Sequence, residues 1–107
     1  MSALRQDYTD LTPETILAAV ESAGFETSGR MLALNSYENR VYRCELEEGG
    51  AVVTKFYRPG RWSDEAIGEE HGFAFELAEQ EVPVVAPLLV DGVSLLEHAG
   101  YRFSVFP

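Results

Sequence analysis

Lys55 and Glu70 are placed in the sequence so that they could form an ion pair, and such a pair could take part in chemistry. Lys55 lies in the apolar run of residues 52–57, and in an alternating strand it shares a face with Val53. Glu70 lies in a segment of helical periodicity, three residues after Ile67, and falls on its apolar side at about 100° per residue. Because an unpaired buried carboxylate is costly, such a residue usually comes with a cation. We therefore expect Lys55 and Glu70 to pair across the strand and the helix.

A lysine held in this way is suited to binding phosphate. Its ammonium is a mobile positive charge for phosphate oxygens, and a carboxylate keeps it charged and correctly aimed. The neighbouring Glu69 points about 100° away, toward the edge of the apolar face, so Glu70 is the preferred partner, although the sequence leaves the choice open. The alternative is that Lys55 is a solvated charge on an edge strand and Glu70 a carboxylate on the helix surface.

Two helices and several strands must position this pair. Thr12 and Pro13 are a helix start, and Gly24 is a natural C-terminal cap, so a first helix is predicted at residues 13–23. Ser63 caps a second helix, which should run to about Gln80. Strands are predicted at residues 31–34, 40–46 and 51–57, and two or three more among residues 88–90, 94–98 and 101–106. The fold class is therefore α+β, with an antiparallel sheet of about five strands and two helices.

Length and composition limit the number of domains and the classes of partner that this chain can have. The 107 residues fit one small domain, so residues 1–107 are predicted to be a single domain. The formal net charge of −10 argues against nucleic acid and anionic membranes as partners. Cys44 is the lone cysteine, and we identify neither a Cys/His metal cluster nor a targeting or membrane-spanning segment. A cytoplasmic protein without metal ligands of its own is expected.

The order of these features resembles the small lobe of the kinase superfamily, where a lysine of the third strand is oriented by a glutamate of the following helix. The likeness narrows to the bacterial stress response kinase A (YihE/RdoA) family, in the aminoglycoside phosphotransferase-like branch. It is carried by Leu-Asn-Ser-Tyr-Glu-Asn-Arg-Val-Tyr at 34–42, Lys-Phe-Tyr-Arg-Pro at 55–59, Arg-Trp at 61–62, Glu-Glu-His at 69–71, Val-Pro-Val at 82–84 and Phe-Ser-Val-Phe-Pro at 103–107.

The resemblance implies an ATP site on this lobe. The turn at residues 35–39 takes the place of the glycine-rich loop over the phosphates, yet it contains no glycine, so the standard backbone approach to the phosphates is absent. Valines of two strands would sandwich the adenine, and the last strand would enter the hinge between lobes. The implied cofactor-binding residues are Lys55, Glu70, Ser36, Asn39, Val41, Val53 and Phe106.

The resemblance also implies a serine/threonine protein kinase that uses ATP and Mg²⁺. In the family its catalytic aspartate and magnesium ligands belong to the large lobe, and we identify no catalytic loop within residues 1–107. No catalytic residue is therefore expected here, Mg²⁺ would be bound mainly by the absent lobe, and the isolated chain would be inactive. The aromatic alternation of residues 101–106 suggests a core that continues into an absent part, which favours a truncated protein over a naturally short module.

Two other functions remain open. One is a kinase of the same fold that phosphorylates a small molecule, such as homoserine, choline or an aminoglycoside, because acceptor specificity would come from the large lobe. The other is a non-enzymatic acidic domain that binds a protein through exposed apolar surface. The latter predicts that Lys55 and Glu70 lie more than about 6 Å apart, beyond the reach of a direct ion pair.

Overall fold

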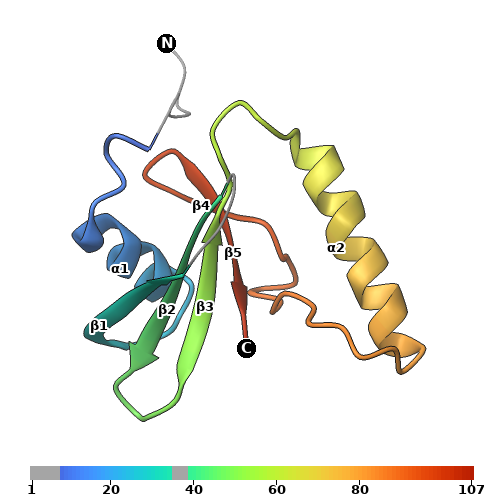
Figure 1. Cartoon of the computed structure of the whole chain (residues 1–107), viewed down its shortest axis with the longest axis horizontal. Coiled ribbons are helices and arrows are strands. Elements are labelled where there is room, and N and C mark those ends of the chain that lie inside the picture. Colours follow the sequence, from blue (N-terminus) through green and yellow to red (C-terminus); the bar gives the residue numbers. More distant parts are fainter. Residues whose placement is uncertain (1–7, 35–38) are drawn as a thin grey trace.

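The computed structural model describes residues 8–34 and 39–107. A five-stranded sheet has the strand order β1-β2-β3-β5-β4, and every neighbouring pair is antiparallel. One helix precedes the sheet and the second interrupts it after the third strand (Figure 1). In chain order the elements are α1 (Pro13–Ser22), β1 (Thr27–Leu34), β2 (Arg40–Leu46), β3 (Ala51–Phe56), α2 (Asp64–Glu79), β4 (Leu96–His98) and β5 (Tyr101–Phe106). The predicted α+β class is confirmed.

Both helices begin at the predicted caps. The Thr12 hydroxyl accepts a hydrogen bond from Thr15 N at 3.3 Å, and Pro13 follows it in the first turn of α1. The Ser63 hydroxyl does the same for Ala66 N at 3.0 Å in α2. The ends differ from the prediction by one residue each, because the last predicted residue of each helix is its C-cap.

The core lies between α1 and one face of the sheet. Strand β3 alternates regularly between half-buried and buried residues, and its buried side faces the helix. The buried core comprises Ile16, Ala19, Val20, Tyr42, Cys44, Val52, Phe56, Tyr101, Phe103 and Val105. The expectation that the aromatic strand continues into an absent core is therefore wrong for its inward residues, which α1 covers within this chain.

The other face of the sheet carries the residues of interest. Lys55 lies opposite Val41 of β2 and opposite Ser104 of β5. Val53 lies opposite Phe106. Since directly paired residues project from the same face of a sheet, these five residues share the face that α1 does not cover.

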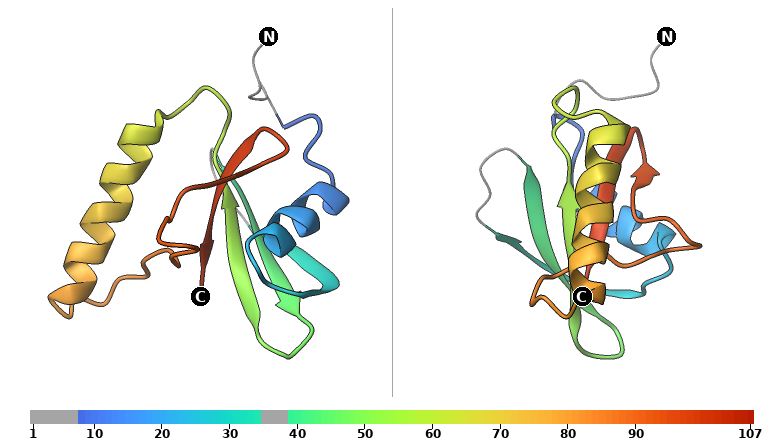
Figure 2. Two further views of the ribbon diagram at one scale, coloured as in Figure 1. Left: turned by 180° about the vertical axis from the view of Figure 1, so that it is seen from behind. Right: turned by 90° about the vertical axis from the view of Figure 1, so that its right-hand side faces the viewer.

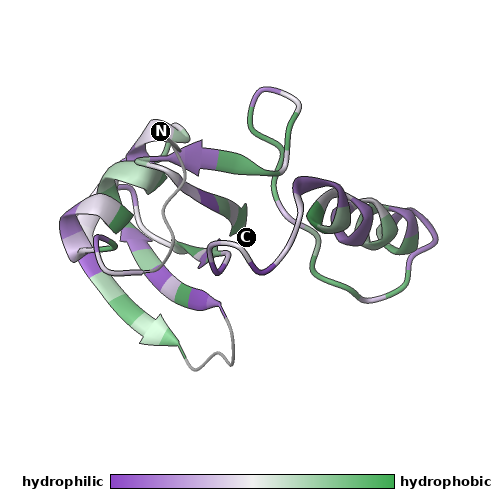
Figure 3. Ribbon diagram, turned by 90° about the horizontal axis from the view of Figure 1, so that it is seen from above, coloured by the Kyte–Doolittle hydropathy of each residue, from purple (hydrophilic) through white to green (hydrophobic). Residues whose placement is uncertain are grey.

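Helix α2 stands on the side of the sheet away from α1 (Figures 1 and 2). Its N-terminal end is tied to β5 by Arg102, whose guanidinium pairs with the Asp64 carboxylate and donates to Trp62 O at 2.6 Å. Beyond that anchor the helix exposes much of its surface, Phe73 included. Figure 3 shows apolar residues continuing through the segment after α2, where Val85 and Leu89 are exposed.

Four predicted strands have different limits. β4 starts at Leu96 rather than Ser94. β1 starts at Thr27, four residues before the predicted start, because its register shifts near Gly29, whose φ of 92° breaks the expected pattern. Residues 88–90 do not form a strand; Val90 makes an isolated bridge with Val93 around a tight turn. β3 ends at Phe56, although Tyr57 N still donates to Arg102 O at 3.0 Å.

Among the described residues, neither helix has the length and apolarity that a bilayer crossing requires.

Candidate functional site

The structure brings Lys55 and Glu70 together. Lys55 Nζ lies 3.8 Å from Glu70 Oε1, so Glu70 rather than Glu69 is the partner. The Lys55 side chain is 26% exposed, whereas that of Glu70 is 67% exposed. The expectation of an inward, buried Glu70 is therefore wrong: the carboxylate stands at the rim and reaches the lysine from there. Nor is Lys55 on an edge strand, because β3 lies between β2 and β5.

A tyrosine ring supports the lysine on a second side. Lys55 Nζ lies 5.2 Å from the centroid of the Tyr57 ring, within the range of a cation–π interaction. Tyr57 itself is only 3% exposed, so this ring is a fixed surface. Lys55 is also the only lysine in the chain. The ammonium is thus held between an aromatic face and a carboxylate, with part of its surface open to a ligand.

Behind this pair lies a buried polar network that the sequence did not reveal. The Tyr57 hydroxyl shares hydrogen bonds with His71 Nε2 at 2.8 Å and with Ser104 Oγ at 2.9 Å. His71 Nδ1 shares a third with Ser94 Oγ at 2.7 Å. The available signals were that Tyr57 has the strand parity of Lys55 and that His71 follows Glu70 and lies one turn after Ile67.

Burial decides the protonation states in this network. It lowers the pKa of His71 below its ordinary value; the Glu70 carboxylate opposes this shift, and the Lys55 ammonium adds to it. Burial likewise raises the pKa of the Tyr57 phenol. Both rings are accordingly neutral near pH 7, and a neutral imidazole donates with one ring nitrogen and accepts with the other. The chain of hydrogen bonds can then be satisfied throughout.

A small cavity opens beside the lysine. Its volume is about 130 Å³, and it is lined by Asn39, Lys55, Tyr57, Trp62, Ala66, Ile67 and Glu70. Asn39 ends the predicted phosphate-binding turn, and its Oδ1 accepts from Arg58 N at 3.1 Å. Ser36, in the same turn, lies outside the described residues. One cation, one amide, one carboxylate and two aromatic side chains therefore meet at a single opening.

The apolar residues expected around adenine form a strip next to this cavity. Val41, Val53 and Phe106 are half-buried on the face that carries Lys55. Val53 is two residues from Lys55 along β3, a distance of about 7 Å. The apolar strip and the cation lie side by side, which fits the base and the phosphates of a nucleotide such as ATP.

Among residues 8–34 and 39–107, no group of three or more His, Cys, Asp or Glu side chains could hold a metal ion.

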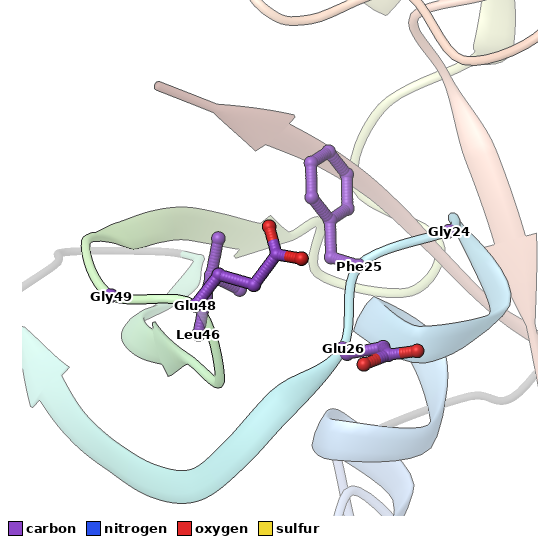
Figure 4. Close-up of a pocket in the computed structure, with 6 residues that line it drawn as sticks. All are labelled: Gly24, Phe25, Glu26, Leu46, Glu48 and Gly49. Atoms are coloured by element: carbon purple, nitrogen blue, oxygen red, sulfur yellow. The ribbon is translucent and has the colours of Figure 1, made fainter.

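A larger hollow elsewhere is chemically unsuited to phosphate. It has a volume of about 280 Å³ and lies at the junction of α1, β1 and the β2–β3 turn. Figure 4 shows two carboxylates among its lining side chains, and the lining contains no basic side chain: Gly24, Phe25, Glu26, Leu46, Glu48 and Gly49. Carboxylates repel phosphate oxygens, so this hollow is less suited to phosphate than the cavity at Lys55, despite its larger volume.

Comparison with known proteins agrees with this geometry. Residues 31–107 match the model of the phosphotransferase enzyme family. Stress response kinase A of Salmonella choleraesuis (strain SC-B67) is 49% identical over 100 residues, which are 94% of this chain. The serine/threonine protein kinase RdoA of Salmonella typhimurium is also 49% identical, and stress response kinase A of Escherichia coli (strain K12) is 46% identical. This chain spans 30% of the length of each relative.

The expected resemblance and the kinase-like α+β fold are confirmed by these matches together with the five-stranded sheet. The family match covers β2, β3, α2 and β5, and therefore includes every described residue of the candidate site. The chain belongs to the phosphotransferase enzyme family.

Proposed function

We propose that this chain is the ATP-binding lobe of a bacterial serine/threonine protein kinase of the stress response type. The observation that carries the proposal is the ion pair of Lys55 and Glu70 at 3.8 Å, placed on the sheet face that α1 leaves open. A strand lysine oriented by a helix glutamate is the arrangement with which kinases hold the α- and β-phosphates. The names of the relatives, stress response kinase A and serine/threonine protein kinase RdoA, support protein serine and threonine as the phosphate acceptors.

Each residue of the site has a proposed role. Lys55 binds phosphate oxygens, and Glu70 keeps its ammonium aimed at them. Asn39, with Ser36 in the same turn, covers the phosphates in place of a glycine-rich loop. Adenine lies on the strip of Val41, Val53 and Phe106, where apolar side chains exclude water from the base.

Phosphoryl transfer requires parts that we place outside residues 1–107. An aspartate must orient the acceptor hydroxyl, and an asparagine and an aspartate must hold Mg²⁺ at the phosphates. We propose that a second lobe of the gene product supplies them, so that the 107-residue chain alone is inactive. The fraction of the relatives that this chain spans, 30%, leaves room for such a lobe. We propose a cytoplasmic enzyme, and the net charge of −10 argues against nucleic acid or anionic lipid as its partner.

The structure bears differently on the two alternative functions, a small-molecule kinase and a non-enzymatic interaction domain. A small-molecule kinase of the same fold would use the same ATP lobe, and the family description prints no acceptor. A non-enzymatic interaction domain predicts Lys55 and Glu70 far apart, so their separation of 3.8 Å counts against it.

The proposal is tested with the complete gene product and MgATP. Lys55→Met removes the ammonium at nearly constant length, and we expect phosphotransfer to protein serine and threonine to fall at least about 100-fold, as when a charge-stabilising donor is lost elsewhere. Arg30→Met on exposed β1 removes the same charge from the same sheet and should leave the rate unchanged. Equal rates for wild type and Lys55→Met would refute the proposal. Transfer to small alcohols but not to proteins would select the small-molecule kinase.

A further inference from the structure

The buried polar network joins four separate parts of the chain. Tyr57 follows β3, His71 belongs to α2, Ser104 to β5, and Ser94 to the segment before β4. Tyr57, His71 and Ser104 are 3%, 3% and 0% exposed. Polar groups at this depth lose their contacts with water, so breaking one of these hydrogen bonds leaves its partner unsatisfied. The network therefore strongly favours one arrangement of α2 against the sheet.

Besides the Arg102 anchor at its N-terminal end, helix α2 rests on few other contacts. Within α2, all of which is described, Ile67 and His71 are the buried residues. They lie four residues apart and so form a stripe one turn long on one side of the helix. Glu70 precedes His71, about 100° around the axis. When His71 is held by Tyr57, the rotation of α2 is set, and Glu70 is presented beside Lys55.

The ion pair is too weak to place the helix by itself. Glu70 is 67% exposed, and ion pairs with so much water around them stabilise a structure little. The network, in contrast, is buried at three of its members. The placement of α2 therefore comes from the buried side, and the ion pair follows from it.

We propose that Tyr57 and His71 are positioning residues for the Lys55–Glu70 pair. The Tyr57 hydroxyl holds His71 and thereby the rotation of α2, while the Tyr57 ring carries the Lys55 ammonium 5.2 Å from its centroid. One side chain thus orients both members of the ion pair. That Tyr57 and His71 thereby promote nucleotide binding rests on the proposed function. That they position the Lys55–Glu70 pair does not.

The test separates the hydroxyl from the ring. Tyr57→Phe keeps the ring under Lys55 and removes the hydrogen bonds to His71 and Ser104. His71→Gln places an amide near the position of Nε2 and can still reach Tyr57, whereas His71→Asn places it near Nδ1 and reaches Ser94 instead. The last two variants remove the same ring and differ in which bond they restore. Val20→Ala, in the α1 core, controls for a general loss of stability.

The direct readout is the acylation rate of the Lys55 amine in the complete gene product, followed on the peptide that contains it. While Lys55 is paired with Glu70, the carboxylate competes with the acylating reagent for the Lys55 amine. We expect Tyr57→Phe, His71→Asn and Glu70→Gln each to raise the rate about two- to fivefold, the range of an exposed ion pair. His71→Gln and Val20→Ala should remain at the wild-type rate. In the Glu70→Gln background, Tyr57→Phe should add nothing, because it acts through Glu70.

A second readout, the Kd for MgATP, separates this inference from the proposed function. We expect Tyr57→Phe to raise the Kd about three- to tenfold, because the contact of a poorly aimed Lys55 ammonium with the phosphates weakens by about the value of one hydrogen bond. If acylation responds as expected but even the wild type does not bind MgATP, the positioning role stands and the proposed function fails. Wild-type acylation in both Tyr57→Phe and His71→Asn would overturn the positioning role, whether or not MgATP binds.

Discussion

Glu70→Gln should separate stability from activity. It removes a carboxylate whose Oε1 lies 3.8 Å from Lys55 Nζ and whose side chain is 67% exposed. At this distance two unit charges attract by about 1 kcal/mol in bulk water and about 4 kcal/mol at an effective dielectric of about 20. Desolvation and side-chain entropy reduce this, and exposed pairs contribute about 0.2–1 kcal/mol. The free energy of unfolding should therefore fall by less than about 1 kcal/mol, measured by urea denaturation.

The same change should affect phosphotransfer much more. Without Glu70 the Lys55 ammonium loses its aim, and small misplacements of a catalytic group lower rates by up to about 100-fold. We expect kcat/KM with MgATP to fall about 10- to 100-fold in the complete gene product. Glu69→Gln is the matched control, because it removes the same charge from the neighbouring position of α2 and leaves the Lys55–Glu70 pair in place.

Two results would refute this reasoning. Equal losses of kcat/KM in Glu70→Gln and Glu69→Gln would show that the helix charge, not the ion pair, matters. A fall of more than about 2 kcal/mol in the unfolding free energy of Glu70→Gln would exceed any exposed pair and make the contact structural.

Three further predictions concern the framework of the site. As the pH falls below about 6.5, the unfolded chain binds a proton at His71 more readily than the folded chain, because burial lowers the folded pKa. This contribution to stability is complete above pH 6.5 and declines below it, by at most about 1.4 kcal/mol per pH unit, and His71→Gln should flatten that part of the pH–stability curve. Arg102→Met should lower the unfolding free energy by about 1.5–3 kcal/mol and speed amide exchange in the first turn of α2, because Trp62 O and Asp64 lose their charged donor; unchanged exchange would contradict the anchor. Ile16→Ala should cost about 2–5 kcal/mol in urea denaturation without moving the Kd for MgATP, and a weaker Kd would contradict the separation of core and site.

Local signals were sufficient for much of the framework. Thr12 and Ser63 cap their helices because a hydroxyl at that position satisfies a free amide, whatever the rest of the fold does. The pairing of Lys55 with Glu70 could also be predicted, because strand alternation assigns Lys55 to one face of the sheet and helix periodicity assigns Glu70 to one side of the helix.

The surroundings of the pair could not be predicted from these periodicities. A helical wheel tells which residues share a side of α2, but not how closely the sheet approaches that side. Glu70 was expected inside and stands at the rim. The helix touches the sheet mainly near Ile67 and His71, so its apolar stripe is only partly used.

The polar network escaped prediction for a different reason. Tyr57, His71, Ser94 and Ser104 are separated by 14 to 47 residues along the hydrogen bonds of His71 and Tyr57. Tyr57, His71 and Ser104 lie in segments that carry the family resemblance, but the resemblance predicted no contact among them. Only the antiparallel pairing of β3 with β5 and the placement of α2 bring them together. A histidine next to the expected glutamate was visible in the sequence, but its partner was not.

The location of the nucleotide is the central claim, and methyl NMR on the complete gene product tests it directly. On titration with MgATP, we predict shifts of the Val41 and Val53 methyl signals, because both lie on the Lys55 face of the sheet. The methyl signals of Val52 and Val105, buried on the opposite face against α1, should remain in place. Saturable MgATP binding that leaves Val41 and Val53 unmoved, or an absence of binding by the wild type, would contradict the claim.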